Sequence, residues 1–76
     1  MASRLTLKYD RVGDILYIEN CPPYPEQESD HLDDEVIARM NPETGQVESL
    51  EILFFSTRLR DGVCELPVTA EMYPAE

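Results

Sequence analysis

The chain has 76 residues and a formal net charge of −10, and 42% of its residues are hydrophobic. This length predicts one small domain over residues 1–76, and the apolar fraction argues against a chain that is disordered throughout. The acidity argues against binding of a nucleic-acid backbone, which needs Lys and Arg. Apolar runs fall short of the roughly 20 residues that span a bilayer, and the first eight residues lack the apolar core of a secretory signal. We therefore expect a cytoplasmic protein that binds neither nucleic acid nor membrane.

The first two predicted strands form a hairpin. Residues 4–9 alternate apolar and polar side chains, with Leu5, Leu7 and Tyr9 on one face, which is the pattern of a half-buried strand. A turn with Gly between two Asp residues follows, and residues 15–20 are rich in β-branched and aromatic side chains. This second strand is apolar on both sides, so we expect a covering element or a second subunit on each face.

The segment at residues 21–34 is predicted to be a loop. It begins with three prolines in four residues, which remove ladder donors and favour an extended path. It continues as an acidic stretch in which Leu32 is the only large apolar residue. A loop of this length in a compact domain is usually functional or disordered.

A second hairpin is predicted after this loop. Residues 34–40 read as the third strand and residues 47–54 as the fourth, the latter with Leu50, Ile52 and Phe54 facing inward. The turn between them contains a proline and a glycine in positions that suit chain reversal.

The remaining residues predict one short helix and an extended end. Ser56 can cap a helix over residues 55–60 with Leu59 on its buried side. Residues 64–70 are either a fifth edge strand or an extended tail, and Pro67 argues against a central strand. The predicted fold is therefore α+β and mostly β: an antiparallel four-stranded meander of two hairpins, one short helix, and an acidic C-terminal tail over residues 62–76.

The negative charge is concentrated in two segments. Residues 26–36 carry six acids and no base, and residues 61–76 carry four acids and no base. A charge run of this kind is usually a solvated loop that keeps the protein soluble. It can also steer a basic partner, or form a cation site.

One histidine and two cysteines are candidate metal ligands or nucleophiles. His31 lies beside Asp30, Asp33 and Asp34, which reads either as an exposed loop histidine or as a weak divalent-metal site, although the spacing is not that of a calcium loop. Cys21 and Cys64 lack the spacing of a zinc site and are expected to be ordinary thiols in a reducing compartment. No cofactor is expected.

Two other sets of charged residues have a structural and a chemical interpretation. Asp10 and Asp14 flank the first turn and are expected to bond nearby backbone amides, although paired carboxylates also serve acid–base catalysis. The second half of the chain has three arginines, namely Arg39, Arg58 and Arg60. They either form a small patch that binds an anion or neutralise Glu48 or Glu51. Because no nucleophile, base and orienting group occur together, we expect that the protein is not an enzyme.

The order of several short motifs resembles a family of small bacterial proteins catalogued as domain of unknown function 2283. The motifs are Tyr9-Asp10, Asp14-Ile-Leu-Tyr-Ile18, Asp34-Glu-Val-Ile-Ala-Arg39, Gly45-Gln-Val-Glu-Ser-Leu-Glu-Ile-Leu53 and Ser56-Thr-Arg-Leu59. The resemblance covers about residues 4–60 and implies a small antiparallel sheet with a short helix. Ser49 stands where the family usually has Gly, and the 21–34 segment and the tail are longer than is typical. The resemblance implies no activity and brings no catalytic residue, although some such small proteins look like partners of compact toxin-like proteins.

The leading functional hypothesis is a protein-interaction module, in the manner of an antitoxin, whose acidic loop and tail bind a basic protein. The alternative is a small ligand- or divalent-metal-binding domain that uses His31 and its neighbouring acids. Because small domains bury little surface, a homo-oligomer, and a dimer in particular, is also expected.

Overall fold

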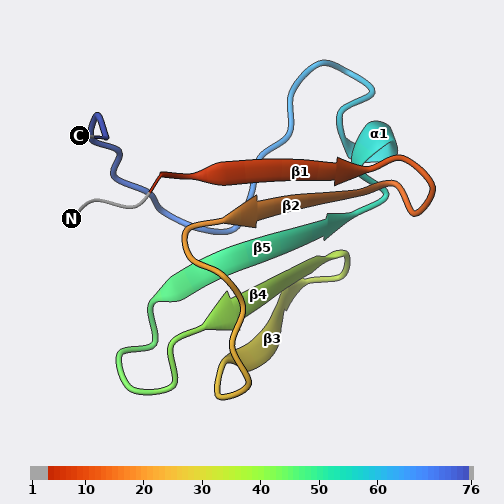
Figure 1. The fold of residues 1–76 in the computed structure, drawn as a ribbon. Helices are drawn as coiled ribbons and strands as arrows, with labels where there is room; N and C mark the ends of the chain where they lie inside the picture. The colour runs from red at the N-terminus through yellow and green to blue at the C-terminus, as the bar shows by residue number, and fades with distance from the viewer. Residues whose placement is uncertain (1–3, 76) are drawn as a thin grey trace.

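The fold is a single five-stranded antiparallel sheet with one short helix. The computed structural model describes residues 4–75, so residues 1–3 of the predicted domain and the last residue of the predicted acidic tail lie outside it. In chain order the elements are β1 (Thr6–Asp10), β2 (Ile15–Glu19), β3 (Glu28–Asp33), β4 (Val36–Met40), β5 (Val47–Leu53) and α1 (Phe55–Arg58). Figure 1 shows them along the sheet in the order β1-β2-β5-β4-β3.

This topology corrects the predicted four-stranded meander. Both predicted hairpins are present, because β1 pairs with β2 and β4 pairs with β5, each antiparallel. The additional strand is β3, which comes from the acidic segment predicted to be a loop and pairs with β4. The segment at 20–27 carries the chain from β2 across to this far edge, so β5 fills the place beside β2.

The sequence pattern does not predict the acidic strand β3, because β3 is an edge strand that is exposed along nearly its whole length. Of its six residues only Leu32 is partly buried, so no alternation of apolar and polar side chains marks it. The register also shifts between His31 and Asp33, a bulge of the kind that is common on sheet edges.

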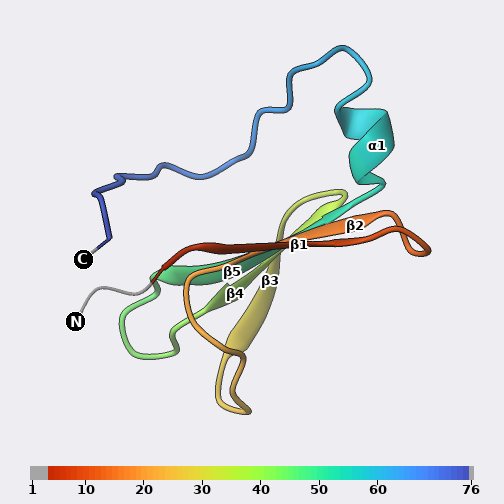
Figure 2. The ribbon, with the colours of Figure 1, turned by 45° about the horizontal axis from the view of Figure 1, so that its top comes forward.

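The core lies on one face of the sheet, under the C-terminal tail. Val36, Ala38, Leu50 and Ile52 are at most 6% exposed, and their strands place them in two facing pairs, Val36 with Ile52 and Ala38 with Leu50. Residues 64–70 form no strand; Leu66 and Val68 of this segment instead pack against the core cluster. Figure 2 shows the tail and α1 together on one side of the sheet.

The chain reverses at the end of β5. Phe54 adopts a left-handed conformation with φ of 52° and is 55% exposed, so the prediction that it faces inward is wrong. Helix α1 follows at once and spans only four residues, without a side-chain cap from Ser56. Leu59 is 40% exposed rather than buried.

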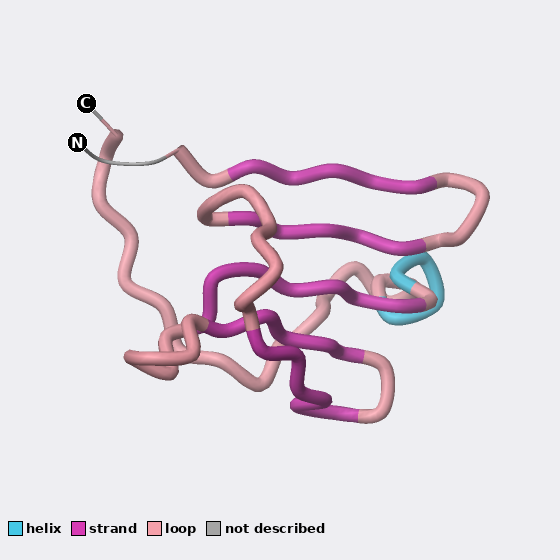
Figure 3. The backbone as a smooth tube through the Cα atoms, turned by 60° about the horizontal axis from the view of Figure 1, so that its bottom comes forward, coloured by secondary structure: helices cyan, strands magenta, loops and turns pink. Residues whose placement is uncertain are grey.

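The two ends of the sheet are free within the described chain. Figure 3 shows β1 at one edge and β3 at the other, each with a neighbour on one side only. No helix among residues 4–75 is long and apolar enough to cross a membrane.

Candidate functional site

The acidic edge is defined here as the outer side of β3 with its flanking carboxylates, namely Glu26, Glu28, Asp30, Asp33, Asp34 and Glu35. Glu28, Asp30 and Asp33 are exposed strand residues, and Glu26 and Asp34 are exposed just outside the strand. Because β3 pairs only with β4, the backbone groups on its other side are open to a further strand. The edge therefore combines carboxylates with unpaired peptide groups.

One end of the acidic edge is tied to helix α1. The guanidinium of Arg58 lies 3.8 Å from a carboxylate oxygen of Asp33 and 3.8 Å from one of Glu35. The backbone amide of Leu53 also donates to the carbonyl of Glu35 at 2.9 Å. These contacts hold the β3–β4 turn against the end of β5, so the neighbouring carboxylates are presented on a fixed backbone.

The side chains weakly indicated as metal ligands do not converge. Asp30 and His31 are consecutive in β3, so their side chains point to opposite faces of the sheet. The carboxylate of Asp33 accepts the backbone amide of Asp34 at 2.8 Å. Among residues 4–75 there is no group of three or more His, Cys, Asp or Glu side chains placed to hold a metal ion.

A hydrogen-bond network around Asp14 joins the first hairpin to helix α1. The hydroxyl of Tyr9 donates to the Asp14 carboxylate at 2.6 Å, and the Ser56 hydroxyl and backbone amide donate to it at 2.6 Å and 3.0 Å. The backbone carbonyl of Asp14 accepts the amide of Phe55 at 3.0 Å, and the rings of Tyr9 and Phe55 pack edge to face. Asp14 itself has a positive φ of 56°, which Asp tolerates better than most residues.

The two aspartates of the first turn have different hydrogen-bond partners. Asp10 accepts the backbone amides of Val12 and Gly13 at 3.0 Å and 3.1 Å, which confirms its predicted turn role. Asp14 bonds no nearby amide and instead binds residue 56, which is 42 positions away. Each carboxylate is therefore engaged by a separate set of donors.

A second network, around Glu48, fixes the crossover between β2 and β3. The Tyr24 hydroxyl and the Gln27 side-chain amide donate to one Glu48 oxygen, and the Asn41 amide donates to the other at 3.4 Å. The Glu48 carbonyl accepts the amide of Asn20 at 2.8 Å. This network explains why a proline-rich segment delivers β3 to a defined position.

The two networks shift the pKa values of their members. Donation from Ser56, and then from Tyr9, lowers the pKa of Asp14 below 3.8, and donation from Tyr24, and then from Gln27, lowers that of Glu48 below 4.5. The bond to Asp14 raises the pKa of Tyr9, and the bond to Glu48 raises the pKa of Tyr24 to about 12. All four shifts favour the protonation states found near neutral pH.

We expect the stability of the protein to fall at both pH extremes. The stabilisation from Asp14 and Glu48 is complete above their unfolded pKa values of 3.8 and 4.5 and is lost as the pH falls toward their lower folded values. The stabilisation from Tyr9 and Tyr24 is complete below pH 10 and is lost as the pH rises through their raised folded pKa values, which is about 12 for Tyr24. Thermal unfolding at constant ionic strength from pH 2.5 to 11 measures both limbs, and a Tm that stays constant from pH 5 to pH 3 would contradict the first.

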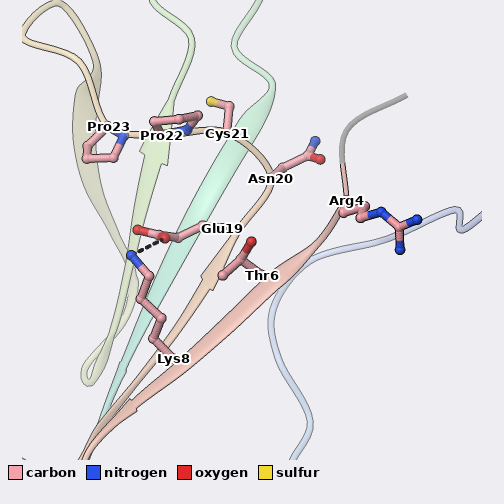
Figure 4. Close-up of a pocket in the computed structure, with 8 residues that line it drawn as sticks. All are labelled: Arg4, Thr6, Lys8, Glu19, Asn20, Cys21, Pro22 and Pro23. Atoms are coloured by element: carbon pink, nitrogen blue, oxygen red, sulfur yellow. Dashed lines mark ion pairs between the residues drawn. The ribbon is translucent and has the colours of Figure 1, made fainter. Parts of the chain in front are cut away.

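Two hollows lie on opposite faces of the sheet. Figure 4 shows the smaller one, of about 470 Å³, where the Lys8 ammonium pairs with Glu19 at 2.9 Å and the Arg4 side chain points away from the other lining residues. The larger is an open, mostly apolar groove of about 1020 Å³ between the sheet and the tail, where Leu66 and Val68 lie. Asp30, His31, Asp33 and Asp34 line neither hollow.

Arg39 and the two cysteines are further candidate residues from the sequence. Arg39 pairs with Glu51 at 2.9 Å, which confirms one of the two predicted roles for the arginines. Cys21 and Cys64 are free thiols, as predicted, and burial, followed by the charge of Glu48, raises the pKa of the Cys21 thiol. A raised pKa makes that thiol less reactive near neutral pH.

The sequence motifs that resemble a known family build the first hairpin, β4, β5 and the Asp14 network. The family described as "Protein of unknown function (DUF2283)" matches residues 6–56. This is most of the chain, and the chain belongs to that family. Tyr9, Asp14 and Ser56 all lie inside the matched segment, whereas Arg58 and the tail lie beyond it. No curated protein and no solved structure matches the chain.

Proposed function

We propose that this protein is a non-enzymatic interaction module, antitoxin-like in kind, whose acidic edge binds an extended segment of a basic protein. The observation that carries the proposal is the placement of six carboxylates along one open edge of the sheet. An added strand takes its affinity from main-chain hydrogen bonds and its specificity from alternate side chains. Carboxylates beside such an edge select for Lys and Arg.

The charge of the acidic edge is largely uncompensated. Arg58 is the ion-pair partner of Asp33 and Glu35, and within residues 4–75 no cation lies in ion-pair distance of Glu26, Glu28, Asp30 or Asp34. Like charges opposite one another destabilise a strand pair, so an acidic segment is rejected. A basic segment gains ion pairs at the same positions.

The rest of the molecule supports selectivity for a basic partner. The formal net charge of −10 attracts cations at long range and raises their association rate at low salt. The four acids of residues 61–76 add to this field, so the tail contributes to steering. Free thiols fit a reducing compartment, and a cytoplasmic location in a bacterium is part of the same proposal.

A defined basic peptide tests the proposal. We expect a nine-residue peptide of alternating Lys and Thr to bind the protein, with an affinity that falls as salt rises. The triple variant Glu26→Gln, Glu28→Gln, Asp30→Asn is expected to weaken binding about tenfold, because each exposed ion pair is worth about 0.2–1 kcal/mol. Fluorescence anisotropy of a labelled peptide measures both effects.

A control variant separates the edge from the overall charge. Asp61→Asn, Glu65→Gln, Glu71→Gln removes the same number of charges from the tail and is expected to change peptide affinity far less. A peptide in which proline replaces the threonines lacks the main-chain N–H donors at those positions. It is expected to bind more weakly than the Lys–Thr peptide. Equal weakening by the two triple variants would reduce the interaction to net charge and would contradict the proposed edge.

A further inference from the structure

We propose that the opposite edge of the sheet, formed by β1, pairs with β1 of a second copy in an antiparallel two-fold dimer. β1 pairs only with β2, and each of its residues is exposed. Figure 1 shows β1 and β3 at the two ends of the sheet, so this surface is separate from the acidic edge. The dimer goes beyond the proposed function and stands or falls independently of it.

The β1 edge lacks the devices that keep strand edges apart. β3 carries several carboxylates, which repel a second copy of the same acidic edge. β1 pairs with β2 in an unbroken register from Thr6 to Asp10 and contains no proline. Its one lysine, Lys8, forms a 2.9 Å ion pair with Glu19 of the neighbouring strand. The charge of Lys8 is therefore compensated and does not prevent another strand from pairing with this edge.

The same strand and the residue before it expose a row of apolar side chains. Leu5, which precedes β1, and Leu7 and Tyr9 within β1 are 54%, 61% and 46% exposed on the face that holds the core. The Tyr9 ring is already fixed by its bond to Asp14 and its contact with Phe55. A rigid aromatic side chain loses little conformational entropy when a partner covers it.

The total surface is large for a compact monomer. The chain exposes 6004 Å², whereas a folded monomer of 8.7 kDa is expected to expose about 4,700 Å². The excess of about 1,300 Å² is larger than the roughly 800 Å² that each partner buries in a standard interface. The molecule therefore has surface to spare for association with a second copy.

Charge selects one register for the paired strands. With Leu7 on the two-fold axis, Arg4 lies opposite Asp10 of the partner subunit, and Leu5 lies opposite the partner's Tyr9. Shifting the axis to Lys8 sets two lysines against each other, and shifting it to Thr6 sets Arg4 against the partner's Lys8. Like charges directly opposite are destabilising, so the Leu7 register is the one that unites opposite charges and apolar rows.

Mass measurement by sedimentation or light scattering tests the dimer directly. At tens of micromolar we expect about 17 kDa, twice the 8.7 kDa chain. Leu7→Lys places two charges at the axis and is expected to raise the dimer dissociation constant at least about 100-fold. Val63→Lys, at a position that is 69% exposed outside the sheet, is the matched control and is expected to remain dimeric.

Cysteine cross-linking tests the register in a Cys21→Ser, Cys64→Ser background. Leu7→Cys is expected to form an intersubunit disulfide on mild oxidation, because opposed Cα atoms lie about 4.5–5.5 Å apart. Thr6→Cys is not, because the two-residue offset separates its copies by about 8 Å. A monomeric native protein at 100 µM, a Leu7→Lys variant that stays dimeric with native circular dichroism, or equal cross-linking at the two positions would each overturn the proposal.

Discussion

Replacing Ile52 with alanine is expected to lower the free energy of unfolding by about 2–5 kcal/mol. Ile52 is 0% exposed and is one of the two largest fully buried side chains. It lies opposite Leu16 of β2 on one side and Val36 of β4 on the other. Truncation leaves a cavity between three strands, and a domain of this size has only about 4–11 kcal/mol of stability in total. The expected fall in Tm is about 10–30 °C.

Urea unfolding monitored by circular dichroism measures this effect. Ile52→Val removes a single methyl group and is expected to cost about 0.5–1.5 kcal/mol. Val63→Ala, at an exposed position outside the sheet, is the matched control and is expected to be close to neutral. All variants are compared at one protein concentration, because association stabilises the folded state. An Ile52→Ala protein as stable as the Val63→Ala protein would contradict the assigned core.

Replacing Asp14 with alanine is expected to detach helix α1 from the first hairpin. The substitution removes the acceptor for Tyr9 and for both donors of Ser56, and it places alanine at a φ of 56°, where a side chain without local hydrogen bonds is strained. We expect a lower Tm and exchange of the Phe55 and Ser56 amide hydrogens that is about tenfold faster. Hydrogen exchange followed by NMR resolves these two amides.

Two further variants separate the backbone effect from the carboxylate effect. Asp14→Gly removes the carboxylate but accepts the positive φ, and Asp14→Asn keeps an oxygen acceptor and tolerates the same conformation. We expect the Tm to be highest for the native protein and to fall in the order Asp14→Asn, Asp14→Gly and Asp14→Ala. If the Asp14→Gly variant had the native Tm, the carboxylate would contribute nothing to stability, and backbone strain alone would explain the lower Tm of the Asp14→Ala variant.

The hairpins could be predicted because their signals are local. The turn at residues 41–46 contains Gly45 with φ of 73°, and Asn41 accepts the amides of Glu43 and Thr44. Residue types within a few positions of each other therefore specified these reversals. Leu50 and Ile52 were identified as core residues by the period-two pattern of their strand.

The acidic strand could not be predicted from its own residues. A strand exposed along most of its length has no apolar periodicity, and a run of acids is more often a solvated loop. What makes residues 28–33 a strand is pairing with β4 and the Glu48 network that positions the crossover. The contacts of Glu48 with Tyr24 and Gln27 join residues that are 24 and 21 positions apart, so a local sequence pattern does not reveal them.

The acidic segment could be identified from the sequence, whereas the arrangement of its side chains could not. Residues 26–36 carry six acids and no base, and His31 with Asp30, Asp33 and Asp34 is only a weak candidate metal site. In the structure, strand geometry divides these residues between two faces. The bond from Ser56 to Asp14 spans 42 positions, and no sequence spacing signalled it.

The central claim is that the acidic edge is the binding surface, and NMR mapping of the alternating Lys–Thr peptide on isotopically labelled protein tests it most directly. We expect amide shifts at residues 26–34, smaller shifts along β4, and no change along β1 or the tail. Stronger protection of the β3 amides from exchange would show that the peptide adds a strand there. Shifts confined to residues 61–75 or to β1, or no shifts at millimolar peptide in low salt, would contradict the account.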